Sequence, residues 1–127
     1  MGHTLGESMP KFMLVLYESD VSRGNAPADV RTTALQKYSA WAQSLRERGK
    51  FLGSERLLQD GRVMKGFGTQ LRITDGPYAE AKEVFGGYWA LEVESYEEAV
   101  ELCRNSPHLE YGGTIEIREV GECPKDK

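Results

Sequence analysis

Residues 12–17 form the apolar run Phe-Met-Leu-Val-Leu-Tyr, which constrains the fold more than any other segment. A strand with one face in water alternates polar and apolar side chains, whereas here both alternating faces are apolar. Burial of the second face, at about 25 cal/mol per Å², is worth several kcal/mol. The sequence therefore predicts a strand that is covered on both sides.

The rest of the chain predicts an alternation of strands and helices. Further strands are expected over residues 51–58, 63–74, 88–94 and 114–120. Helices are expected over residues 30–48, over residues 79–84, and between Ser95 and Pro107. Ser95 followed by Glu98 is the pattern of a helix start, because the two side chains accept hydrogen bonds from otherwise free backbone N–H groups. Pro107 disfavours a helical conformation of the residue before it, which predicts the end of this helix.

Two details of this pattern are specific. The segments 51–58 and 63–74 flank the turn Gln-Asp-Gly at residues 59–61, which predicts an antiparallel hairpin. Leu71 and Ile73 in its second strand are expected to face inward. Gly86 and Gly87 are expected to stop the helix of residues 79–84.

The order of the elements is roughly a doubled strand-helix-strand pattern and indicates the α+β class. A ferredoxin-like sandwich, with two helices on one face of an antiparallel sheet, accommodates it. Such a sandwich leaves the other face of the sheet open, so the run at residues 12–17 needs a cover. A second copy packed face to face supplies that cover, and we therefore expect a homodimer.

Length and composition limit the number of domains, the binding partners and the location that we expect for the protein. A chain of 127 residues suits one domain, which we place at residues 10–121, between a flexible N-terminal extension at 1–9 and a C-terminal tail at 122–127. The net charge of −4 argues against nucleic-acid binding. No apolar run approaches the roughly 20 residues that cross a bilayer, and no signal peptide is visible, so a cytoplasmic protein without membrane contact is expected.

Residues 75–83 read Asp-Gly-Pro-Tyr-Ala-Glu-Ala-Lys-Glu, a turn followed by helix formers. This segment resembles the DGPFAETKE signature of the YCII-related family, also called DGPF-motif proteins, with Tyr78 in place of Phe and Ala81 in place of Thr. The similarity continues through Gly-Gly-Tyr-Trp at residues 86–89 and Gly-Thr-Ile-Glu-Ile-Arg at residues 113–118, and covers most of residues 11–120.

The resemblance implies a ferredoxin-like fold assembled as a dimeric α+β barrel. It also implies two kinds of activity. One branch of the family is thought to use a His–Asp pair in a cleft, but this sequence has Tyr38 and Ser106 at those two positions. The DGPF branch is linked with extracytoplasmic-function sigma factors, which suggests a partner in such a regulatory system.

Asp75 is the leading candidate for a catalytic residue. A carboxylate at a strand end beside Tyr78 is suited to act as a general base or to anchor a polar substrate. The alternative is structural, because Asp-Gly-Pro is a turn sequence in which the Asp side chain caps nearby N–H groups. The motif itself does not separate these two roles.

Aromatic residues and one histidine are the other candidates. The candidates for substrate binding in an aromatic pocket between sheet and helix, which otherwise belong to the core, are Tyr17, Trp41, Tyr78, Tyr88 and Trp89. His108 is a weaker catalytic candidate, either a general acid or base near Glu110 or a solvated loop residue.

No metal site and no cofactor is expected. A lone domain histidine lacks ligands at a recognisable spacing, and the chain has no phosphate loop or dinucleotide fingerprint. Cys103, within a helical pattern, is expected to be a small core residue and Cys123 a solvated thiol.

Two functions remain open on the sequence alone. The first is a binder or enzyme that transfers a proton on an aromatic or polar metabolite, with Asp75 as its main polar residue. The second is a non-catalytic interaction module that serves a sigma-factor system through its acidic surface. Shared folds cannot decide between them, because one scaffold hosts many chemistries.

Overall fold

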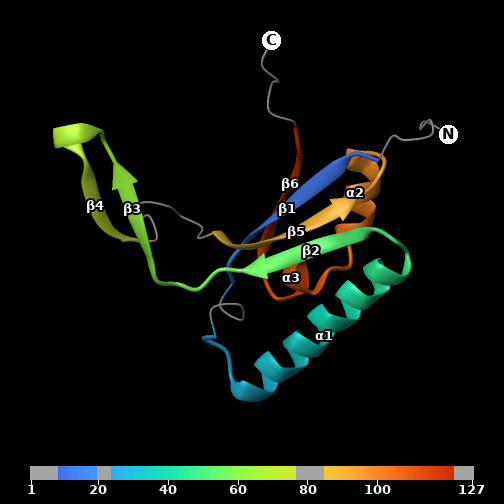
Figure 1. Ribbon diagram of the computed structural model, residues 1–127. Coiled ribbons are helices and arrows are strands. Elements are labelled where there is room, and N and C mark those ends of the chain that lie inside the picture. The colour runs from blue at the N-terminus through green and yellow to red at the C-terminus, as the bar shows by residue number, and fades with distance from the viewer. Residues whose placement is uncertain (1–8, 20–23, 77–84, 122–127) are drawn as a thin grey trace, which may run out of the picture.

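A four-stranded antiparallel sheet forms the centre of the molecule (Figure 1). The computed structural model describes residues 9–19, 24–76 and 85–121. The sheet consists of β1 (Lys11–Tyr17), β2 (Phe51–Arg56), β5 (Phe85–Glu92) and β6 (Thr114–Glu119), in the order β2-β5-β1-β6. This order, with helices after β1 and β5, confirms the predicted ferredoxin-like α+β fold.

Three helices accompany the sheet: α1 (Ala28–Glu47), α2 (Tyr96–Cys103) and α3 (Pro107–Glu110). The predicted cap of α2 is confirmed, because the Ser95 hydroxyl accepts a hydrogen bond from the Glu98 N–H at 3.1 Å. Gly49, with a φ of 70°, follows the C-terminal end of α1 in a left-handed conformation that only glycine adopts at low cost. Among the described residues, no helix is both long and apolar enough to cross a membrane.

Pro107 begins a helix, although the sequence predicts only that it ends one. It occupies the first turn of α3, where its missing N–H costs nothing, and the Ser106 hydroxyl accepts from the Leu109 N–H at 3.3 Å. The prediction of a loop after Pro107 was therefore wrong. The extra helical turn carries His108.

The core lies between the helices and one face of the sheet. That face presents Phe12, Leu14 and Leu16 of β1 and Trp89 and Leu91 of β5. The helices contribute small and aliphatic side chains: Ala42, Leu45, Ala99 and Cys103. Cys103 is a buried core residue, as predicted, and burial raises the pKa of its thiol to about 11.

The opposite face of β1 presents Met13, Val15 and Tyr17, which are partly buried within the single chain. No helix in the described residues packs against these side chains in the way that the core residues are covered. This is the face for which the sequence predicts a second copy.

The strand predicted over residues 63–74 was wrong. Two strands, β3 (Gly61–Lys65) and β4 (Arg72–Gly76), pair with each other around the short 3-10 helix η1 (Gly68–Gln70). Gly66 and Gly68 have φ values of 94° and 60°, which allow the chain to reverse inside the predicted strand. The predicted hairpin between residues 51–58 and 63–74 was wrong too, because β2 pairs with β5.

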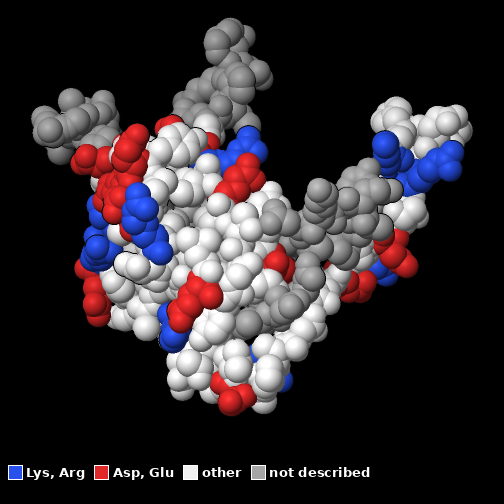
Figure 2. Space-filling model, turned by 180° about the vertical axis from the view of Figure 1, so that it is seen from behind, with Lys and Arg blue, Asp and Glu red and all other residues white. Residues whose placement is uncertain are grey.

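The β3–β4 hairpin extends away from the four-stranded sheet as a separate arm (Figure 1). Leu71 and Ile73 do not face inward as predicted, since they are 42% and 58% exposed. Figure 2 shows basic side chains near the tip of the arm, where Lys65 pairs across the strands with Arg72.

The Gly86–Gly87 pair lies inside β5 and does not end a helix as predicted. A side chain on Gly87 would meet the Glu55 carbonyl, so the glycine permits the close approach of β5 to β2. The helix predicted over residues 79–84, Tyr78, Cys123 and most of both predicted terminal segments lie outside the described residues.

Candidate functional site

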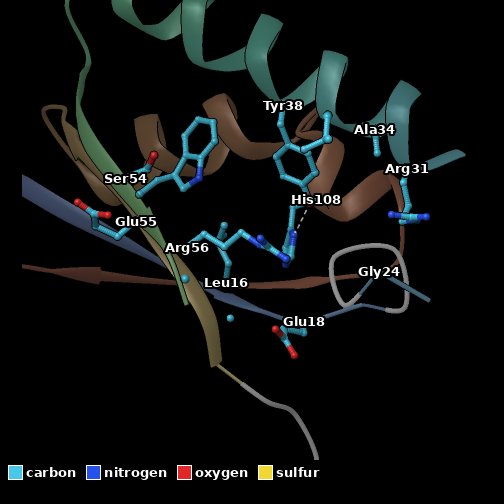
Figure 3. A pocket seen from close by; sticks show the side chains of 14 residues that line it. Leu16, Glu18, Gly24, Arg31, Ala34, Tyr38, Ser54, Glu55, Arg56 and His108 are labelled. Carbon is cyan, nitrogen blue, oxygen red and sulfur yellow. Dashed lines mark hydrogen bonds between the residues drawn. The ribbon is translucent and has the colours of Figure 1, made fainter. Parts of the chain in front are cut away.

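A cavity of about 420 Å³ lies between α1 and the end of the sheet where β1 and β2 finish (Figure 3). This volume falls within the range of small-molecule sites. Its apolar side chains are Leu16, Ala34, Leu35 and Trp89. Its polar side chains are Glu18, Arg31, Tyr38, Ser54, Glu55, Arg56 and His108. An apolar wall with a few convergent polar groups is the usual composition of a ligand site.

Tyr38 and His108 form a hydrogen-bonded pair at this cavity. The Tyr38 hydroxyl oxygen lies 2.7 Å from His108 Nδ1, and His108 Nε2 lies 2.7 Å from the main-chain oxygen of Tyr17 (Figure 3). A carbonyl oxygen can only accept, so Nε2 carries the proton and donates it. Nδ1 of the neutral ring must then accept, and the Tyr38 hydroxyl donates to it.

Burial sets the charge of both groups. His108 is 2% exposed, and loss of water lowers the pKa of its imidazole, with a partial offset from hydrogen bonds to the backbone of Tyr17 and Thr114. Burial likewise raises the pKa of the Tyr38 hydroxyl to about 12. Both side chains are therefore uncharged at neutral pH, which agrees with the direction of the hydrogen bonds.

Local sequence around α3 fixes the position of His108. The Ser106 cap and Pro107 start the helical turn, and the Gly113 N–H donates to the His108 carbonyl at 2.8 Å. A side chain on Gly113 would overlap the imidazole ring. Residue 113 must therefore be a glycine, because the His108 ring fills the space that a Cβ atom would need.

A surface ion pair joins α1 and α3 close to this pair, one residue from Tyr38 and two residues from His108. Lys37 Nζ and Glu110 Oε2 are 2.7 Å apart, and both side chains are about half exposed. Exposed pairs of this kind contribute little stability. Glu110, near which the sequence places His108 as an acid or base, is thus engaged by Lys37.

Within the described part of the chain, His108 and Trp89 are the sequence-predicted site residues whose side chains line the cavity. The alternative of a solvated loop histidine was wrong, because the ring is buried and lies on α3. Tyr17 contributes its main-chain oxygen, while its hydroxyl donates to Glu116 Oε1 at 2.8 Å. Trp41 packs on Trp89 with ring centres 4.4 Å apart and does not line the cavity.

Tyr88 and Asp75 are also placed outside the cavity. Tyr88 pairs with Val15 and lies on the sheet face opposite to Trp89. Asp75 lies in β4 on the arm, with its side chain 92% exposed and its carboxylate 3.7 Å from Arg62. Tyr17, Trp41 and Tyr88 belong to the main sheet and α1, whereas Asp75 lies on the arm, and the catalytic role predicted for Asp75 stays a prediction.

Sequence reasoning missed most polar residues of the cavity: Glu18, Arg31, Tyr38, Ser54, Glu55 and Arg56. Tyr38 carried a signal, since it matches the position of a helix histidine in one branch of the family that the sequence resembles. The arginines carried none, because nothing local distinguishes them from other exposed basic residues.

The family model of the YCII-related domain matches residues 10–124, which is nearly the whole chain. The chain belongs to the YCII-related family. The resemblance drawn from the sequence is therefore confirmed. Comparison with curated proteins found no match. In this YCII-related chain Ser106, at the position of the expected aspartate, caps α3, and Tyr38 pairs with a different residue, His108.

The described residues contain no group of three or more His, Cys, Asp or Glu side chains that could hold a metal ion. The chemistry that the described cavity offers is proton transfer by a tyrosine hydroxyl and an imidazole, beside two guanidinium groups.

Proposed function

We propose that this YCII-related protein binds a small molecule in the cavity and transfers a proton at the Tyr38 hydroxyl. The observation that carries the proposal is the Tyr38–His108 hydrogen bond of 2.7 Å at the wall of the cavity. Buried acid-base pairs at a concave, mostly apolar site are typical of enzymes.

The proposed step is a two-proton relay. A substrate C–H or O–H gives its proton to the Tyr38 oxygen while the hydroxyl proton of Tyr38 moves to His108 Nδ1. His108 becomes an imidazolium whose Nε2–H is held by the Tyr17 carbonyl at 2.7 Å. The electron pair stays on the substrate, and reversal of the relay returns a proton to the same or a neighbouring atom.

The relay avoids a tyrosinate. With a pKa of about 12, ionising Tyr38 at neutral pH would cost several kcal/mol. Passing the proton on to His108 keeps the tyrosine neutral throughout, so the pair is a better base than the hydroxyl alone. The reaction class is therefore proton abstraction next to a carbonyl or from an acidic hydroxyl.

The test is hydrogen exchange on phenylpyruvate and acetophenone in deuterated water, followed by NMR. The wild type is expected to exchange the acidic C–H of at least one of them faster than buffer, and Tyr38→Phe and His108→Gln to lose at least tenfold of that rate. Tyr96→Phe, which removes a hydroxyl from an exposed side chain of α2 outside the cavity, serves as the matched control. Equal exchange by wild type and Tyr38→Phe would sink the proposal.

We also propose that the protein is a homodimer assembled through the open sheet face. The partly buried Met13, Val15 and Tyr17 on that face support it, because a second copy would remove them from water. This assembly would be the dimeric α+β barrel that the family resemblance implies.

A protein-partner role is the second candidate function, and the arm favours it. Met64 and Phe67 on the β3–β4 arm are 64% and 92% exposed, which is more apolar exposure than an isolated hairpin tolerates well. A sigma-factor system remains the partner suggested by the resemblance. Binding of a defined partner that is lost in Phe67→Ser and retained in Tyr38→Phe would support this role.

A further inference from the structure

Two guanidinium groups line the cavity without a carboxylate partner among the described residues. Arg31 extends from α1, and its Nε donates to the Ala26 carbonyl at 3.0 Å. Arg56 ends β2 and points toward the space below Tyr38 (Figure 3). Neither arginine forms an ion pair within the described part of the chain. Each is therefore available to a ligand.

Two glutamates, Glu18 and Glu55, line the cavity, but the carboxylate of Glu55 is directed away from the Tyr38–His108 pair (Figure 3). Ser54 and Arg56 pair with Trp89 and Gly87, whereas Glu55 between them pairs with Tyr88 on the opposite face of the sheet. Accordingly, the Glu55 carboxylate points away from the Tyr38–His108 pair in Figure 3. Two cations thus face one carboxylate, Glu18, with His108 uncharged.

The remaining wall is apolar. Leu16, Ala34, Leu35 and Trp89 cover the sheet and helix sides of the space. Apolar walls favour a ligand with an aryl or alkyl body, while arginine recognises carboxylates through two parallel N–H bonds.

We propose that the cavity is selective for small apolar carboxylates, with the carboxylate held by Arg56 and Arg31 and the apolar body against Trp89. This inference rests on the proposed function, since it names the substrate class of the same cavity. Binding in this orientation would hold the carboxylate of the ligand beside Tyr38 and His108, so that the reacting proton of the ligand lies close to the Tyr38 hydroxyl.

The test is calorimetric titration with 2-naphthoate and 2-naphthamide, which share a shape and differ in charge. The wild type is expected to bind the carboxylate at least tenfold more tightly than the amide. Arg56→Gln and Arg31→Gln should each weaken naphthoate binding by roughly tenfold or more and leave the amide unchanged. Arg62→Gln on the arm is the matched control and should change neither affinity.

Glu18→Gln gives a second check. It removes the lining carboxylate that, unlike Glu55, is not on the opposite face of the sheet, so it should leave naphthoate binding unchanged or strengthen it. Loss of naphthoate binding in Glu18→Gln, equal binding of acid and amide, no naphthoate binding, or full naphthoate binding in both arginine variants would each overturn the inference.

The two proposals can fail separately. Arginine-dependent naphthoate binding together with equal hydrogen exchange in wild type and Tyr38→Phe would keep the carboxylate site and remove the proton-transfer role. Tyr38-dependent exchange with equal affinity for acid and amide would keep the proton-transfer role and remove the selectivity for anions.

Discussion

The Tyr38 hydroxyl and His108 Nδ1 lie 2.7 Å apart, although 70 residues separate them in the chain. The bond joins the middle of α1 to the single turn of α3, and Nε2 of the same ring reaches the last residue of β1. One imidazole thus connects two helices and the sheet at the wall of the cavity. The predictions below follow from that position.

Tyr38→Phe should lower the free energy of unfolding by about 1–3 kcal/mol, because it leaves the buried Nδ1 of His108 without a donor. Tyr96→Phe removes the same atom from an exposed side chain, whose hydroxyl accepts from the Glu119 N–H at 2.9 Å, and should cost about 0.5 kcal/mol or less. Chemical denaturation of both variants measures the difference. Equal losses would mean that the Tyr38–His108 bond is not a buried one.

Stability should fall as the pH drops below neutrality. Burial lowers the folded-state pKa of His108 below its ordinary value of 6.5, so the unfolded chain takes up a proton that the folded protein resists. The free energy of unfolding should therefore decrease as pH falls through 6.5 toward the folded-state pKa, and level off below it.

Calorimetry between pH 8 and pH 5 checks this slope. His108→Gln should flatten it, whereas His3→Gln, which removes the only other histidine, should retain it. Glu98 does not interfere, because hydrogen bonds from the Glu94 N–H and Lys50 lower the pKa of its carboxyl and move its contribution to more acidic pH. A slope that survives in His108→Gln contradicts the prediction.

Gly113→Ala should destabilise the protein by about 1–3 kcal/mol, because the new methyl group overlaps the His108 ring. Gly61→Ala, at a glycine with open space around it, is the control and should be nearly neutral. In a His108→Ala background the ring is gone, so the cost of Gly113→Ala should shrink. If Gly113→Ala cost the same free energy of unfolding in that background, the new methyl group would not be clashing with His108.

Asp75→Asn should change the free energy of unfolding by no more than about 0.5 kcal/mol and leave naphthoate affinity unchanged. The carboxylate is 92% exposed, and its contact with Arg62 at 3.7 Å is a weak surface pair. Thermal denaturation and titration of the variant measure both effects. A loss of naphthoate binding in the variant would show that Asp75 belongs to the naphthoate site and contradict the assignment of that site to the cavity.

Val15→Lys should convert the proposed homodimer into a monomer, since it would bury a charge at the centre of the open sheet face. Val100→Lys makes the same exchange on α2, on the helix side of the molecule, and should leave the dimer intact. Light scattering at micromolar concentration measures the mass. A monomeric wild type would end the proposal.

The sequence predicts the elements of the fold where periodicity is strong. The runs that became α1, α2 and β6 each show one clear period, and the continuous apolar run of residues 12–17 became β1. The β3–β4 arm was missed because Leu71 and Ile73 look like core residues, while the turn comes from the backbone freedom of Gly66 and Gly68. Apolar character alone does not reveal which side chains the fold covers.

The site was less accessible to prediction because it is assembled from distant segments. Arg31 and Tyr38 come from α1, Arg56 from the end of β2 and His108 from α3. Pro107 has the same local signature at the end of one helix and at the start of another, so His108 was placed in a loop. Burial lowers the pKa of the His108 imidazole, and this burial arises only from the tertiary packing of the chain.

A long-range proton–nitrogen correlation NMR spectrum of histidine-labelled protein at pH 7 tests the central claim most directly. The account predicts a neutral His108 ring with its proton on Nε2 and an unprotonated Nδ1 whose resonance shifts when Tyr38→Phe removes the hydroxyl donor. A charged ring, or a ring with its proton on Nδ1, would contradict the account, because Tyr38 would then have no acceptor for its proton.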